Sequence, residues 1–484
     1  MIETNPTHGK LRQAFQLFDL STLSVSSVAP MFSVAAAGGA MAQAAGAAVP
    51  LAIVLIAIPF LLCSWIFLSL NQHFPNAGAS YHWSRRIIGI NYSNYQAWIV
   101  IMAYFWSIPP ILLPAATFTL GALGINSPSN ALQMLVAILW ALFAAAVLLW
   151  GPRLTARVTQ IFLFVEVVSV LAMAIIGYAS WGPAVTGAAD FSFQHIHWVG
   201  VVVCMVIAAT IVDGWEIDSY ASEEAHKPRI TPGWGGIIGA LSVVVYYLTI
   251  WPLLLHQVPL QTLQNSSNTL GTWGAAVMPH FLSLLRIAVI ASTAGSLWLT
   301  TFILSRALFA MSRDGLMAKW VGALNKHCVP RMAIIIPIMS SIAVVLMQVF
   351  FPSMQALFSV VLSAAGFFLV AEFLFDGINM FAFLVLHHKT VRHSMKKHRH
   401  MGLLLASVVV VASLSVVEVL FFIYGPKYIG SGIDQTIIAM FLLGIIYIIW
   451  LKWHKTGTKT FIFNENDASY VASAGPVLIH DRRY

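Results

Sequence analysis

Long apolar stretches alternate with short polar segments along almost the whole chain. A bilayer core of about 30 Å is crossed by roughly 20 apolar residues in a helix. By this criterion the chain has twelve predicted spans, at residues 20–45, 49–70, 93–121, 130–150, 154–180, 198–222, 235–256, 281–310, 332–351, 355–387, 402–424 and 434–454. The pattern therefore predicts an all-α polytopic membrane protein with about 12 transmembrane helices.

The composition supports this fold class and leaves no room for a separate soluble domain. Hydrophobic residues make up 59% of the 484 positions and charged residues only 9%, whereas soluble domains carry about 25% charged residues. The three cysteines have neither the spacing of a disulfide framework nor that of a zinc site. Residues 1–19 and 455–484 are predicted to be terminal tails, and we expect the second to be loosely ordered because it lacks periodicity.

The basic residues indicate the orientation of the chain. If both termini are cytoplasmic, only Arg286 and Lys427 of the 25 basic residues lie on or near the outer side. This is the distribution that the positive-inside rule predicts, so we expect a cell-membrane protein with both termini in the cytoplasm. The loop at 388–400 is strongly basic, which favours a determinant of orientation, with an anionic-lipid contact or a histidine-rich metal site as alternatives. The net charge of +8 therefore gives no reason to expect nucleic acid binding.

The sixth predicted span, 198–222, carries an unusual group of polar residues. Asp213, Glu216 and Asp218 surround Gly214 before the span is complete. A carboxylate at membrane depth costs several kcal/mol unless it faces a cavity, a partner or water, and irregular backbone is tolerated there only beside protein or water. The segment therefore predicts a broken transmembrane helix that lines a polar site, as in many secondary transporters.

Three motifs, one of which contains this polar group, agree with this interpretation. They are FPNAGASYHWSRRIIG at 74–89, VDGWEIDSYASEEAHKPR at 212–229 and SRALFAMSRDGLMAKW at 305–320. In this order and spacing they resemble the permeases of the amino acid–polyamine–organocation (APC) superfamily, over about residues 15–450. The resemblance implies a ten-helix core of two inverted five-helix repeats, at 20–180 and 198–387, with helices 1 and 6 broken. Two additional helices would follow in 401–454.

The resemblance also implies a substrate site built from the two broken segments. Its predicted residues are Ser27, Val28, Ala29, Pro30, Met31 and Phe32 in the first span, and Asp213, Gly214, Trp215 and Glu216 in the sixth. The family carries a glycine-rich break in the first span, whereas here proline would break the helix; an ordinary kink is the alternative. The tryptophan is expected either to form a wall over the substrate or to pack in the core. The two acids either bind substrate or support the broken backbone.

Other acidic residues in the spans are further candidates. The resemblance aligns Glu166 with a lysine of some proton-coupled members, so we predict that Glu166 is the proton-coupling residue; a neutral, hydrogen-bonded glutamate is the alternative. Asp218, Glu223 and Glu224 are expected to pair with basic residues at the cytoplasmic side. For Glu372, Asp376 and Glu418 four roles stay open: lining a path, tuning the site for a cationic substrate, holding a proton permanently, or pairing with Arg286.

Together these features predict a secondary active transporter that moves an amino acid by alternating access, with a proton as the coupling ion. Sodium is the alternative ion, and no other cofactor or metal is expected. The expected partners are an amino acid or amine substrate and membrane lipids, and the oligomeric state stays open. Alternatives are an exchanger, a polyamine or amine permease and, from another class, an ion channel or a non-transporting receptor. The sequence has no phosphate-binding glycine loop and no catalytic motif, which argues against an ATP-driven pump and an enzyme.

Overall fold

The computed structural model describes residues 9–473 except 126, 191, 193, 195, 351–353, 388–394, 430–432, 465 and 467–468. Within these residues nine helical stretches are long and apolar enough to cross a membrane, and the first of them, Leu17–His73, contains two predicted spans. The apolar helices Trp198–Val212 and Arg331–Leu346 are shorter. Each of the twelve predicted spans falls on a helix or on two consecutive helices, so the predicted all-α polytopic fold class is confirmed.

The first five spans, together with the segment between the second and third, contain eight helices. These are α1 (Leu17–Val28), α2 (Pro30–Ala45), α3 (Val49–His73), α4 (Ala79–Ile87), α5 (Ile90–Ser107), α6 (Pro109–Ala122), α7 (Asn130–Leu149) and α8 (Pro152–Ala179), with the 3₁₀ turn η1 (Gly46–Ala48) after α2. Prolines at the starts of α2, α6 and α8 explain where these helices begin, because proline lacks the N–H that a first helical residue does not need.

The next five spans and the segments between them contain short helices as well as long ones. These are α9 (Trp198–Val212), α10 (Ile217–Tyr220), η3 (Ser222–Glu224), α11 (Thr231–Gln257), α12 (Leu260–Gln264), α13 (Thr269–Val277), η4 (Pro279–Phe281), α14 (Leu282–Arg313), η5 (Lys319–Gly322), α15 (Arg331–Leu346), η6 (Met347–Phe350) and α16 (Met354–Leu386). The two helices of the interrupted first span pack against helices later in the chain: α1 packs on α11, and α2 packs on α9.

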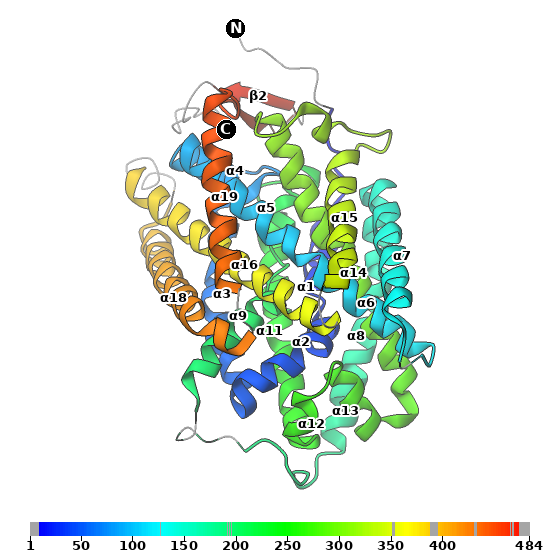
Figure 1. Cartoon of the computed structure of the whole chain (residues 1–484). Coiled ribbons are helices and arrows are strands. Elements are labelled where there is room, and N and C mark those ends of the chain that lie inside the picture. Colours follow the sequence, from blue (N-terminus) through cyan, green and yellow to red (C-terminus); the bar gives the residue numbers. More distant parts are fainter. Residues whose placement is uncertain are drawn as a thin grey trace.

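The C-terminal part adds two helices and a hairpin. Helices α18 (Lys397–Ile429) and α19 (Ile433–Trp453) lie beside α16 (Figure 1). Strands β1 (Thr460–Asn464) and β2 (Ser469–Ser473) then pair antiparallel. The prediction of a loosely ordered C-terminal tail is therefore wrong for the described part of 455–484. Figure 1 shows the hairpin at one end of the helical body and α12 and α13 at the other, and we call these the hairpin end and the opposite end.

Candidate substrate site

The first span is interrupted between α1 and α2. Ala29 has a left-handed backbone conformation (φ 49°, ψ 63°), and Pro30 follows as the first residue of α2. Proline disfavours the right-handed helical conformation for the residue before it, which explains why the helix breaks at Ala29. The Ala29 N–H still donates to Val25, and its carbonyl accepts from Ser33, so both backbone groups of this buried residue are satisfied.

The sixth span is interrupted between α9 and α10. Asp213 is extended (φ −85°, ψ 178°), and Gly214 has a φ of 103°. A β-carbon on Gly214 would lie 2.8 Å from the Val28 nitrogen and 2.9 Å from the Ser27 carbonyl carbon. The two interruptions are therefore in contact, and glycine is required both by the backbone conformation and by the lack of space.

A small cavity lies beside the two interruptions, and we call it the central cavity. Its volume is about 50 Å³, which is space for a few water molecules. It is lined by Ser27, Val28, Phe32, Ser33, Tyr104, Ser107, Pro110, Ile111, Thr210, Asp213, Gly214, Ser296, Thr300, Ile303, Leu362 and Ala365. Among these described residues Asp213 carries the one carboxylate, and none is basic. In the rest of the wall, hydroxyl groups provide polar contacts and aliphatic side chains provide apolar ones.

Glu166 of α8 caps the interrupted first span. Its Oε1 atom accepts a hydrogen bond of 3.0 Å from the Met31 N–H and one of 2.6 Å from the Ser292 hydroxyl. The same hydroxyl accepts the Phe32 N–H at 3.1 Å. Helix N-termini favour negative charge because their first N–H groups have no partner inside the helix. Glu166 and Ser292 therefore satisfy the N–H groups of Met31 and Phe32 at the start of α2.

Glu216 supports the interruption of the sixth span. Its Oε2 atom accepts the Gly214 N–H at 2.7 Å, and its Oε1 atom accepts the Tyr104 hydroxyl at 3.0 Å. Tyr104 also reaches Glu372 at 3.3 Å, so the hydrogen bonds continue away from the cavity. Glu216 itself is buried and lies outside the cavity lining. This geometry corresponds to the supporting role that the sequence left open.

Glu372 and Asp376 belong to a buried polar network rather than to an ion pair. Glu372 accepts from the hydroxyls of Tyr220 at 2.6 Å and Ser80 at 3.0 Å. Asp376 accepts from Ser80 at 2.7 Å, and also from the side-chain amides of Gln96 and Asn379 at 3.0 and 3.1 Å. The suggested pairing of these acids with Arg286 is wrong, because these partners lie on other helices than α14.

Two buried ion pairs close the hairpin end. Glu224 of η3 binds Arg306 of α14 through two hydrogen bonds of 2.9 and 3.0 Å, and Glu223 binds Arg313 in the same bidentate manner at 2.9 and 3.1 Å. The predicted pairing of Glu223 and Glu224 with basic residues is confirmed. For Asp218 it is wrong: its carboxylate packs against Gly235, and no ion pair joins it to a basic residue that the structure describes.

The C-terminal hairpin packs over these ion pairs. The Tyr470 hydroxyl donates to Glu223 at 2.6 Å, and the Arg313 guanidinium lies 4.0 Å from the centre of the Tyr470 ring. On the same side Arg85 of α4 donates to the carbonyls of Gly457 and Lys459. The hairpin thus contacts both α4 and the end of α14, and it covers the hairpin end of the broken sixth span.

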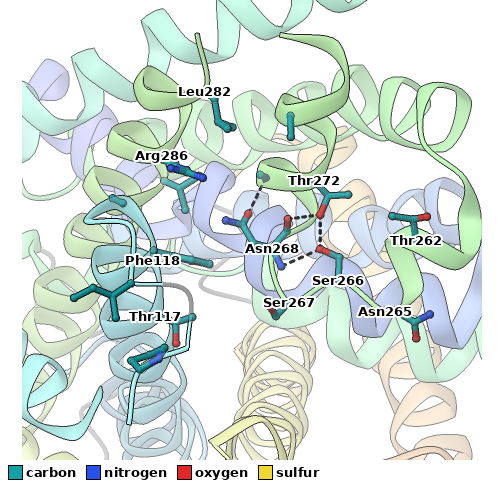
Figure 2. Close-up of a pocket in the computed structure, with 17 residues that line it drawn as sticks. Thr117, Phe118, Thr262, Asn265, Ser266, Ser267, Asn268, Thr272, Leu282 and Arg286 are labelled. Atoms are coloured by element: carbon teal, nitrogen blue, oxygen red, sulfur yellow. Dashed lines mark hydrogen bonds between the residues drawn. The ribbon is translucent and has the colours of Figure 1, made fainter. Parts of the chain in front are cut away.

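A wider cavity opens at the opposite end, and we call it the peripheral cavity. It measures about 720 Å³ and is bordered by α6, α13, α14 and the loop 265–268 (Figure 2). Phe118 lines this cavity, Phe32 lines the central one, and the two rings pack edge to face with centroids 6.5 Å apart. The two cavities are therefore neighbours separated by an aromatic pair.

Some of the predicted site residues line the central cavity, and the others lie behind it or in the core. Ser27, Val28, Phe32, Asp213 and Gly214 line the central cavity. Ala29, Pro30 and Met31 form the break behind it, and Glu166 contacts that break. Trp215 is 1% exposed, stacks on Phe373 at 5.5 Å and lies outside the lining, so it packs in the core in this conformation.

Sequence reasoning did not identify the wall of the central cavity that α6 and α14 provide. Ile111 of α6 and Ser296, Thr300 and Ile303 of α14 complete this wall. Their apolar and hydroxyl side chains are ordinary residues of a transmembrane helix, so the sequence gives no signal that distinguishes them. Within the described ranges no cluster of three or more His, Cys, Asp or Glu residues is arranged to hold a metal ion.

Two broken membrane helices that meet beside a small polar cavity define a membrane transport protein of the permease class. Comparison with protein families agrees: the amino acid permease family model matches residues 15–456, and the chain belongs to this family of the APC superfamily.

Two relatives show the same class. The branched-chain amino acid permease BcaP of Lactococcus lactis subsp. cremoris (strain MG1363) is 25% identical over 319 residues, which is 60% of this chain and 67% of the relative. Amino acid transporter protein 6 of Caenorhabditis elegans is 30% identical over 141 residues, which is 27% of this chain and 25% of the relative.

Proposed function

We propose that this permease moves a small neutral amino acid across the cell membrane by alternating access, coupled to a proton. The observation that supports it best is the contact of the two helix breaks beside a cavity whose single described carboxylate is Asp213. An ammonium group bound there would be neutralised by Asp213 and surrounded by hydroxyls. Val28, Ile111 and Ile303 offer an apolar surface to an aliphatic side chain, and the name of the bacterial relative fits such a substrate.

The hydrogen bonds of Glu166 suggest how proton and substrate are coupled. An ionised Glu166 holds the Met31 N–H and the Ser292 hydroxyl. Protonation removes the charge that makes it the favoured acceptor, since hydrogen bonds to ionised groups are roughly twice as strong as neutral ones. The Met31 N–H then becomes available to the substrate carboxylate. Proton and amino acid would therefore bind together, which is the requirement for symport.

In this scheme the hairpin end faces the cytoplasm, as the positive-inside rule predicts for both termini. The structure then corresponds to a state closed at the cytoplasmic side by the Glu223 and Glu224 ion pairs. The central cavity of about 50 Å³ is smaller than an amino acid, so substrate entry requires it to widen as Phe32 and Phe118 separate.

Uptake into proteoliposomes tests the proposal directly. We expect saturable uptake of at least one aliphatic amino acid from a radiolabelled panel, with accumulation driven by an inward proton gradient. In Glu166→Gln the gradient should no longer drive accumulation, while exchange against unlabelled substrate inside the vesicles persists. Normal accumulation in this variant would reject the coupling role, and a sodium gradient that replaces the proton gradient would identify the other ion.

A second candidate is an exchanger or a permease for amines. It is favoured by Asp213, because a cavity with one carboxylate and no described basic residue suits an amine without a carboxylate. The same panel separates the two functions: uptake of amines in preference to the corresponding amino acids would support the second. Uptake that appears only with substrate inside the vesicles would indicate exchange.

A further inference from the structure

The peripheral cavity contains a cation without an anionic partner. Arg286 of α14 lines it and is half-buried, and no hydrogen bond or ion pair joins its guanidinium to any residue that the structure describes. A guanidinium withdrawn from water normally binds a carboxylate or phosphate, whose planar oxygens match its donors. Arg286 is therefore placed to bind an anion that enters the cavity.

The wall near Arg286 is polar and held by its own hydrogen bonds. Asn268 accepts the Gly271 N–H at 2.8 Å, and its own N–H donates to Ser266 at 3.1 Å. The hydroxyls of Ser266 and Thr272 are 2.7 Å apart. Figure 2 shows Asn268, Ser266 and Thr272 beside one another, with Arg286 and Phe118 to their left. The loop is thus held by its own hydrogen bonds and can offer amide and hydroxyl groups to a ligand.

The peripheral cavity cannot be an extension of the central one. Both cavities border α14, and Arg286 precedes Ser296 by ten residues, which corresponds to about 15 Å along a helix. The rings of Phe32 and Phe118 lie between them. An amino acid is too short to reach Asp213 and Arg286 together, so a solute would occupy the two sites one after the other.

We propose that Arg286 and the loop 266–272 form a first binding site for the carboxylate of the incoming amino acid. This inference rests on the proposed function, because it assumes an amino acid substrate. The peripheral site recognises the carboxylate, and Asp213 of the central site recognises the ammonium group once Phe32 and Phe118 separate. Together they select a zwitterion over an amine or a simple acid, each of which satisfies one site alone.

A thiol-labelling experiment measures the charge of the peripheral site independently of transport. Ser267 lines the cavity and is exposed, so Ser267→Cys in a Cys328→Ser background provides the reporter; Cys63 and Cys204 are buried. Anionic and cationic methanethiosulfonates of similar size are compared at low ionic strength. We expect Arg286→Gln to lower the anionic-to-cationic rate ratio about ten-fold, while Arg286→Lys retains most of it. An unchanged ratio in Arg286→Gln would overturn the proposal.

Protection from labelling identifies the ligand chemistry. L-leucine and isovalerate, which carry a carboxylate, should slow the labelling of the reporter, whereas isopentylamine should not, and the protection should be absent in Arg286→Gln. Chloride replaces isovalerate at constant ionic strength as the control, and equal protection by chloride would overturn a carboxylate site. Protection by isovalerate in a protein that transports no amino acid would retain the site and reject the proposed function instead.

Discussion

Gly214 is the residue at which the two helix breaks come closest, so a single methyl group there tests the geometry of the site. In Gly214→Ala the new β-carbon would lie 2.8 Å from the Val28 nitrogen and 2.9 Å from the Ser27 carbonyl carbon, both backbone atoms of a buried segment. The φ of 103° is in addition outside the range that alanine adopts. A sparsely populated backbone conformation costs about 1–3 kcal/mol, and overpacking about 1–3 kcal/mol more.

We therefore expect Gly214→Ala to lower the free energy of unfolding by about 2–6 kcal/mol and to abolish substrate uptake. Thermal unfolding of the purified protein and uptake into proteoliposomes measure the two effects. Gly182→Ala is the matched control, because no atom lies within 4 Å of its added β-carbon and its φ is not in the left-handed range. Wild-type stability and uptake in Gly214→Ala would show that the two breaks are not in contact.

Two further variants probe the hairpin end. Glu224→Gln leaves the buried Arg306 without its bidentate carboxylate, so we expect the free energy of unfolding, measured by thermal unfolding, to fall by about 3–5 kcal/mol. Recovery of stability in the double variant Glu224→Leu/Arg306→Met would identify the unpaired charge as the cause. Burial lowers the pKa of His82 from 6.5 to about 4, although the nearby Asp314 carboxylate opposes the shift. The unfolded chain then binds a proton at His82 below about pH 6.5, whereas the folded protein binds it only near pH 4, so the free energy of unfolding falls as the pH drops through this window. About 2 kcal/mol of the loss between pH 7 and 4.5 should be absent in His82→Gln. An identical pH dependence of unfolding in the two proteins would contradict this.

The helices and both breaks could be predicted because their causes are local. Apolar stretches of about 20 residues define spans, and Pro30 and Gly214 mark the two interruptions through their own backbone properties. The charges of Glu223 and Glu224 at the end of the sixth span, together with basic residues at the same predicted side of the membrane, were enough to predict ion pairs. In each case a short segment contains the physical reason for the structure.

Features that depend on distant contacts could not be predicted. Whether Trp215 lines a cavity or packs on Phe373 is decided by α16, more than 150 positions away along the chain. The hairpin of the C-terminal tail has weak sequence periodicity, and it is held by contacts of Tyr470 with Glu223 and Arg313 that no local pattern reveals. The partners of Glu166 likewise come from α2 and α14.

The positions of these partners suggest how one proton could act on the whole cycle. Helices α8 and α14 pack against each other and carry Glu166 and Ser292, whereas Met31 belongs to the broken first span. Protonation of Glu166 would thus weaken the contact of α8 and α14 with the broken first span, while the packing of α8 against α14 would stay unchanged. The same α14 also holds the hairpin end closed through Arg306 and Arg313. A movement of the two broken spans relative to α8 and α14 would therefore break the Glu166 contact and the two ion pairs together, so the proposed coupling residue and the hairpin end would respond to the same displacement.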